Sequence, residues 1–246
     1  MIQDENRDPA TGQRAGDAIL LLTSSFVQLT EAGQISVLDD REHVFQSVYG
    51  WWVWINRSSQ LVLLAHDAGR GHEAAPSVRS ILEHALVLHW VVEVGDDAMA
   101  AVKAAGTENR RKLFDHAHKA NWPIPPDITR PEKATHPLSG MITNFADLCI
   151  AYDAETLYVP YRTLSAHVHP SPKGAEAYLG DDGTLINHGT RPIHDHLVLT
   201  AISLIMAARA INSLLAGHPL VEAITHAQDQ LGTTIESPRL RRASDR

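Results

Sequence analysis

The sequence predicts an all-α fold, an irregular bundle of several helices with one proline-rich and one glycine-rich loop. Long segments repeat apolar residues at the three- to four-residue spacing that is typical of one helix face. Aspartate, proline and glycine stand at the ends of these segments, where helices start and stop. The chain has no internal repeat and no sustained heptad, so we expect irregular packing rather than a coiled coil.

Four helices are predicted in the first half of the chain, at residues 9–33, 39–64, 76–94 and 96–119. The second carries three of the five tryptophans, and polar residues near 56–59 predict an interruption in it. The third is apolar around most of its circumference, which predicts a central, buried helix. The fourth is amphipathic and more charged, so one of its faces should meet water.

A break in the pattern separates the two halves. Residues 121–137 contain five prolines, which a regular helix or a central strand does not tolerate, so this segment is predicted to be a loop. Helical spacing resumes over residues 138–150 and 154–167. Pro160 is expected to restart the second of these helices, because proline suits a first helical turn.

The C-terminal part contains a loop, two helices and a tail. Residues 170–192 form the glycine-rich loop, and helices follow at 194–215 and 219–231. Residues 1–232 are therefore predicted to form one helical domain. Residues 233–246 form a basic tail that we expect to be disordered.

Composition limits the classes of function. The single cysteine excludes an internal disulfide and fits a reducing compartment, and the start of the chain does not resemble a secretory signal, so we expect a cytoplasmic protein. The most apolar segment, residues 44–64, is interrupted by polar residues, which predicts no membrane span. A net charge of −8 argues against a broad nucleic-acid-binding surface but allows a local phosphate site.

Residues 161–172 contain the densest group of side chains that could take part in binding or catalysis. Within nine residues this segment places one arginine, two aliphatic hydroxyls and two histidines, side chains that bind or transform anions. If a helix starts at Pro160, its free backbone N–H groups and positive dipole end would favour an anion beside Arg162. Helical spacing puts His169 on the same face as Arg162 and puts His167 on another.

The spacing from Arg162 to His167, and also that from Arg162 to His169, resembles the motif of the HEPN superfamily, many of whose members are metal-independent ribonucleases. The resemblance implies a histidine that acts as acid or base at the RNA 2′-hydroxyl and an arginine that stabilises the phosphate. It also implies a homodimer, with the site across the interface. Arg79 and His84 repeat the spacing in the helix predicted to be buried.

A wider resemblance concerns two segments. Residues 74–92, with Arg79 and Glu83 four apart on one helix face, and residues 161–167 together resemble the uncharacterised bacterial family called domain of unknown function 5677. The resemblance implies that the two helices pair around a buried polar site. A buried arginine needs a partner, and Glu83 is within reach. The supporting residues are then Arg79, Glu83, Tyr161 and Ser165.

Two alternatives involve a metal ion. His43 and the pair His66-Asp67 resemble the start of the HD-type phosphohydrolase motif, in which a divalent ion activates water, although Ala65 interrupts the pattern. The second alternative is a histidine-rich set that could hold zinc, iron or manganese. Its members are His167, His169, His188, His194, Asp195 and His196.

The leading hypothesis from the sequence is cleavage of RNA without a cofactor, with RNA bound at a local site. The catalytic candidates are Arg162, His167 and His169. The alternatives are the metal-dependent phosphohydrolase with His43, His66 and Asp67, and a non-enzymatic helical binding or defence module.

Overall fold

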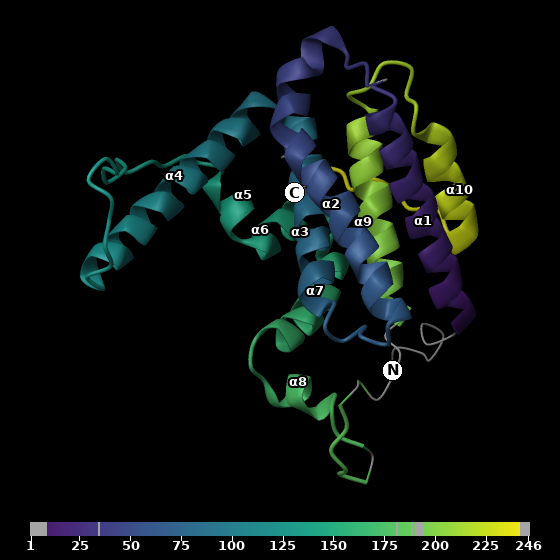
Figure 1. The fold of residues 1–246 in the computed structure, drawn as a ribbon. Helices are drawn as coiled ribbons and strands as arrows, with labels where there is room; N and C mark the ends of the chain where they lie inside the picture. Colours follow the sequence, from purple (N-terminus) through teal and green to yellow (C-terminus); the bar gives the residue numbers. More distant parts are fainter. Residues whose placement is uncertain (1–8, 34, 181, 188, 190–193, 242–246) are drawn as a thin grey trace.

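The computed structural model describes residues 9–33, 35–180, 182–187, 189 and 194–241. Over these residues the all-α prediction is confirmed, because the chain forms helices and only two isolated β-bridges. Five helices make the main bundle (Figure 1), with α3 and α9 at its centre. They are α1 (Pro9–Glu31), α2 (Glu42–Asp67), α3 (Ala75–Val94), α9 (His194–Asn212) and α10 (Val221–Leu231).

The two central helices are apolar because other helices cover them. α3 packs against α2, α7 and α9, and its apolar residues are buried around the helix, as predicted. The segment Asp195–Asn212 of α9 is long and apolar enough to cross a membrane, but 72% of it is buried inside the bundle. Its apolar side chains are therefore part of the hydrophobic core, where α1, α2, α3 and α10 pack around them.

α2 runs without the predicted interruption near residues 56–59, which corrects that expectation. The amide of Asn56 donates to the carbonyl of Trp52 at 2.8 Å, and the hydroxyl of Ser59 donates to the carbonyl of Ile55 at 2.8 Å. Both polar groups bond one turn back along the same helix, so they can be buried without breaking it.

α4 (Asp96–Lys119) projects away from the bundle (Figure 1). Its first half packs through Ala98, Ala101 and Ala105, which are small enough to allow close approach. Its second half makes a protruding arm with the proline-rich loop, residues 121–137, which has no helix or strand, as predicted. The chain then returns to the bundle through α5 (Ser139–Thr143) and α6 (Phe145–Ala151).

α7 (Glu155–Val168) continues through Pro160 and does not restart there, which corrects a second expectation. The N–H that proline lacks would have bonded to the carbonyl of Thr156, in the exposed first turn, where water can replace the bond. Arg162 therefore lies in the middle of α7, away from any helix N-terminus. A short helix, α8 (Pro172–Glu176), follows below the bundle (Figure 1).

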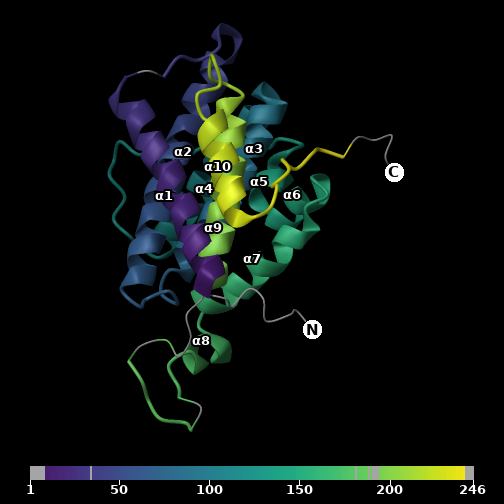
Figure 2. The same ribbon diagram turned by 90° about the vertical axis from the view of Figure 1, so that its right-hand side faces the viewer.

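Residues 233–241 have no regular structure, but they lie against the bundle (Figure 2) instead of forming the disordered tail expected from composition. The carbonyl of Pro238 accepts from Nε2 of His89 at 2.8 Å. The backbone N–H of Arg241 donates to the carbonyl of Ala151 at 2.8 Å, and its guanidinium pairs with Asp153 and Glu155. These polar contacts hold the segment across α3 and α6.

The buried amide of Asn56 gives a test of how α2 tolerates polar groups. Asn56→Asp should lower the free energy of unfolding at pH 7 by about 3 kcal/mol, because a carboxylate cannot donate to Trp52 and would be an unpaired buried charge. The loss should shrink near pH 4, where the acid is protonated and can donate. Urea unfolding at both pH values measures this, with Asn56→Ala as the uncharged control. Equal losses for the two variants at pH 7 would contradict the explanation.

Candidate functional site

The predicted pairing of the two polar helix segments is present. Nη2 of Arg79 on α3 donates to the hydroxyl of Tyr161 on α7 at 2.6 Å, and the guanidinium carbon lies 4.6 Å from the centre of the tyrosine ring. Phe145 and Tyr158 pack beside that ring, with centroids 4.4 Å and 5.8 Å away. Hydrogen bonding and cation–π attraction thus act on one arginine and fix α7 against α3.

Two supporting residues have other roles than those expected. Arg79 pairs with Tyr161 and forms no ion pair with Glu83 among the described residues, because the guanidinium is drawn over the ring. Glu83 is half-buried on α3. The hydroxyl of Ser165 donates to the backbone carbonyl of Tyr161 at 2.8 Å, which is a bond within α7. Ser165 therefore supports the helix locally.

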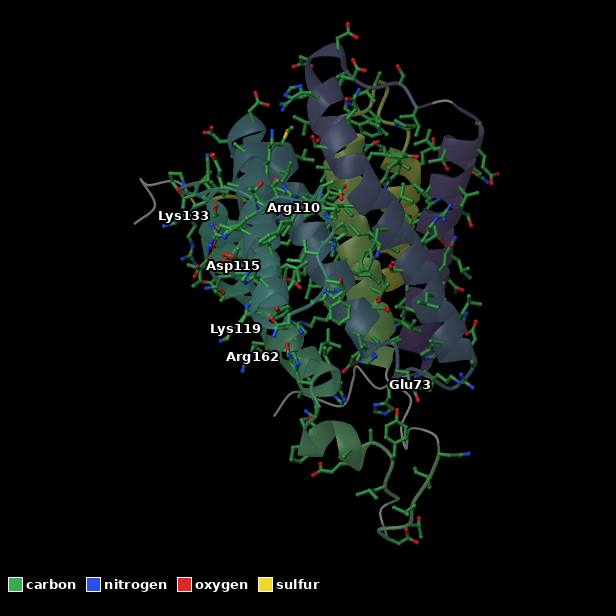
Figure 3. The ribbon with its side chains drawn as sticks, turned by 60° about the vertical axis from the view of Figure 1, so that its left-hand side comes forward. Glu73, Arg110, Asp115, Lys119, Lys133 and Arg162 are labelled. Carbon is green, nitrogen blue, oxygen red and sulfur yellow. The ribbon has the colours of Figure 1, made fainter. Side chains whose placement is uncertain are left out.

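Arg162 and His169 are not aligned by a common helix. Arg162 is exposed in the middle of α7 and is labelled in Figure 3. His169 follows the last residue of α7 with φ −99° and ψ 148°, an extended conformation that proline at the next position favours. The helical spacing that placed these two side chains on one face therefore ends before His169.

His167 lies in a group of histidines from three separate segments, which we call the histidine cluster: His72, His167 and His196. The ring centroids of His72 and His167 are 5.9 Å apart. Nδ1 of His196, at the start of α9, bonds to the carbonyl of Gly71 at 3.0 Å and so holds the α2–α3 loop. Both ring nitrogens of His72 are buried, and neither has a hydrogen-bond partner among the described residues.

Burial keeps members of the cluster neutral. It lowers the pKa of His167, and the nearby His72 and Lys173 lower it further. Burial lowers the pKa of His196 to about 4, although its bond to the Gly71 carbonyl acts in the opposite direction. The neighbouring His167, His72 and His66 add to the lowering for His196. At neutral pH, His167 and His196 therefore each keep one ring nitrogen able to accept a proton.

Tyr178 and Gly189, which follow α8 in the chain, pack against the histidine cluster. The hydroxyl of Tyr178 donates to Oε1 of Glu73 at 2.9 Å, and the tyrosine ring centroid lies 6.3 Å from that of His72. Burial and Glu73 raise the pKa of Tyr178. Gly189 lies so close to His72 that a Cβ atom would be 2.0 Å from the imidazole ring, so a larger residue there would force the His72 ring to shift.

The metal site proposed from His43, His66 and Asp67 does not form. His43 and His66 lie at opposite ends of the uninterrupted α2, about 35 Å apart at about 1.5 Å per residue. His43 instead pairs with Asp96 at 2.8 Å. Within the described part of the chain, no three His, Cys, Asp or Glu side chains lie close enough to hold a metal ion.

The second metal site suggested by the sequence, the histidine-rich set, is also not brought together as a whole. His167 and His196 meet in the cluster, whereas His169 is exposed and lies past the end of α7. Asp195 stands in the first turn of α9. His188 lies outside the described residues, as does the side chain of His194.

The second match to the arginine–histidine spacing is part of the packing. Nδ1 of His84 bonds to the carbonyl of Ser80 at 2.7 Å, one turn back on α3. The His84 ring stacks on Trp54 of α2 with centroids 4.4 Å apart. These contacts join α2 to α3, so spacing alone does not distinguish a packing histidine from one in the cluster.

Sequence reasoning missed His72. The sequence Asp67-Ala-Gly-Arg-Gly-His72 indicated a turn, and only the tertiary fold brings that turn to the end of α7. A usable signal was present, because a turn rich in glycine that ends in histidine leads directly into the central helix.

The fold and the cluster together define an all-α protein with a polar site where α3, α7 and the α2–α3 loop meet. Within that class, the chain belongs to a family of unknown function (DUF5677), whose model matches residues 46–185, more than half of the chain. The matched range contains Arg79, Tyr161, His72 and His167. No curated protein and no solved structure matches the chain.

The Arg79–Tyr161 bond can be tested by removing one oxygen atom. Tyr161→Phe keeps the ring under the guanidinium but removes the acceptor, so it should lower the free energy of unfolding by about 1 to 2 kcal/mol. Tyr158→Phe is the matched control on the same helix and should change it by less than about 0.5 kcal/mol. Denaturant unfolding at pH 7 measures both, and equal effects would contradict the assigned bond.

The lowered pKa of His196 predicts how stability depends on pH. The unfolded chain, with an ordinary histidine pKa near 6.5, binds more protons than the folded protein between pH 6.5 and about 4, so stability falls as pH falls through this range. From pH 7 to pH 5, His196 alone should cost about 2 kcal/mol. His196→Gln should remove that part of the loss, whereas the exposed His226→Gln should not. An unchanged pH slope in His196→Gln would exclude the assignment.

Proposed function

We propose that this protein cleaves RNA phosphodiester bonds without a metal ion, with His167 and His72 as its acid–base pair. The observation that supports the proposal is the approach of the two imidazole rings to 5.9 Å, in a half-buried site where burial lowers the pKa of His167. Two imidazoles at this separation can flank the entering and the leaving oxygen of one phosphate group once Gly189, which lies against the buried His72 ring, moves away.

The chemistry needs no further reactant. Neutral His167 takes the proton from the 2′-hydroxyl, the 2′-oxygen attacks phosphorus, and a bond forms between them. The bond from phosphorus to the 5′-oxygen breaks, and that oxygen leaves with a proton from protonated His72. The products are a 2′,3′-cyclic phosphate and a 5′-hydroxyl. Proton exchange with water then returns both histidines to their starting forms.

Cations near the pair suit the negative charge that builds on the phosphate oxygens. Lys173 on α8 is close enough to His167 to lower its pKa. Arg162 is exposed on α7, five residues before His167, and is the guanidinium that the HEPN spacing assigns to the phosphate. In a homodimer, as that spacing implies, Arg162 would reach RNA bound to the second copy. The bond from His196 to Gly71 would position the loop that carries His72.

Purified protein should cut single-stranded RNA in the presence of EDTA and leave 2′,3′-cyclic phosphate ends. His167→Gln and His72→Gln should each reduce kcat at least about 100-fold, because each removes one proton transfer. Arg162→Ala should reduce kcat/KM about 10-fold or more. Activity should fall below the pKa of His167, where the base is protonated. Gel analysis of labelled RNA measures the cleavage rates of the wild-type protein and the variants at each pH, and mass spectrometry identifies the end groups.

The control is His226→Gln, since this histidine is exposed on α10 and outside the cluster. It should retain full activity. Cleavage that disappears with EDTA, or that survives His167→Gln and His72→Gln at the same rate, would overturn the proposal. Thermal unfolding of each variant separates loss of chemistry from loss of fold.

A further inference from the structure

The projecting arm carries an apolar groove that the proposed chemistry does not use. The second half of α4 and the proline-rich loop enclose about 750 Å³ between them. Leu113, Trp122 and Ile128 line it and are 69%, 71% and 52% exposed. Phe114, Ile124 and Pro131 complete the apolar wall. A contiguous patch of large exposed apolar side chains is unusual on a monomer and marks an interaction surface.

Ion pairs hold the groove open in a fixed shape. Arg130 in the loop donates two bonds to Asp115 on α4, at 2.6 Å and 2.9 Å. Asp115 also pairs with Arg111 at 2.9 Å, and Arg111 pairs with Glu108 at 2.6 Å. This chain of four charges fastens the loop to α4. A groove that is already formed loses little conformational freedom when a partner enters it.

The rim of the groove is basic, although the protein as a whole is acidic. Residues 107–136 contain six Lys and Arg and four Asp and Glu, whereas the whole chain has a net charge of −8. Asp115 and Glu108 are occupied by the ion pairs. Arg110 lines the groove, and Figure 3 shows Arg110, Lys119 and Lys133 along the arm. None of these three forms an ion pair among the described residues, so their charge is available to a ligand.

We propose that the arm groove binds an acidic amphipathic helix of a partner protein. The apolar face of that helix would fill the groove between Leu113, Trp122 and Ile128. Its carboxylates would meet Arg110 at the groove and Lys119 elsewhere on the arm. This is the arrangement by which an amphipathic helix lies in an apolar groove with charge complementarity at the edges.

Two other occupants fit less well. Single-stranded RNA binds platforms on which several aromatic rings stack successive bases, and this wall is mostly aliphatic, with Trp122 its one strongly exposed aromatic residue in the described part of the arm. A second copy of the chain could offer the apolar stripe of α2, formed by Trp54, Leu61 and Leu64. Residues 43–66 contain no Asp or Glu, so that stripe brings no carboxylate to the basic rim.

Binding can be measured with a synthetic helical peptide of about 18 residues that has leucines on one face and glutamates elsewhere. One control peptide replaces every glutamate by lysine, and the other scrambles the order and removes the apolar face. Fluorescence anisotropy of the labelled acidic peptide should give a Kd of about 10 to 100 μM, at least about 10-fold tighter than either control. Binding should weaken as salt rises, since the rim charges are exposed.

Variants place the interaction on the arm. Leu113→Asp should weaken binding at least about 10-fold and Lys119→Glu about 3- to 10-fold, whereas Leu64→Asp on α2 should leave it unchanged. All three positions are exposed, so circular dichroism and thermal unfolding should show an intact fold. RNA cleavage should be the same in the three variants, because none lies in the histidine cluster. The proposal therefore stands or falls independently of the ribonuclease activity.

Several results would overturn it. These are equal binding of the glutamate and lysine peptides, no binding of the acidic peptide, and binding that Leu113→Asp does not reduce. Dimerisation of the protein that Leu113→Asp abolishes would assign the groove to a second copy. Arm-dependent binding of single-stranded RNA, with no binding of the peptide, would assign it to nucleic acid.

Discussion

The packing of α3 against α9 is the constraint on which the rest of the structure depends. Both helices are apolar on nearly every side, so each must be covered by others, and α1, α2 and α10 take those positions. One remaining side of α3 faces α7, and there Arg79 lies over Tyr161. Burial of two apolar helices thus positions α7 and brings His167 beside the loop that enters α3 and the first turn of α9.

The histidine cluster shows how one physical effect sets both chemistry and stability. Removal from water disfavours the charged imidazole, so His167 can accept a proton at neutral pH. The same effect makes the fold weaker in acid, because His196 stays neutral when folded and gains a proton when unfolded. A cluster held without burial would avoid this loss, but its histidines would be charged over more of the pH range and would serve less well as bases.

The parts of the fold that the sequence predicted are those controlled by local chemistry. Helix ends near Pro9, Gly95 and Gly232 follow from proline and glycine at those positions. The apolar residues around most of the circumference of α3 predicted that this helix lies at the centre of the bundle. Errors arose where tertiary contacts decide. Pro160 lies inside a helix that packs on α3, and the helix does not restart there. Arg79 bonds to Tyr161 and not to Glu83, because the packing of α7 on α3 places the tyrosine ring next to the guanidinium. His72 was missed because only the fold carries its loop to α7.

The range shared with the family, residues 46–185, contains the arm, His72 and His167 but not α9 or α10. It therefore includes both proposed functional surfaces and lacks part of the core that holds them. Without α9, the apolar face of α3 would meet water, and His196 would not hold the loop of Gly71 and His72. The segment that defines the family consequently needs a further apolar helix to fold as it does here. That helix acts on the site through His196, which couples the core directly to the histidine cluster.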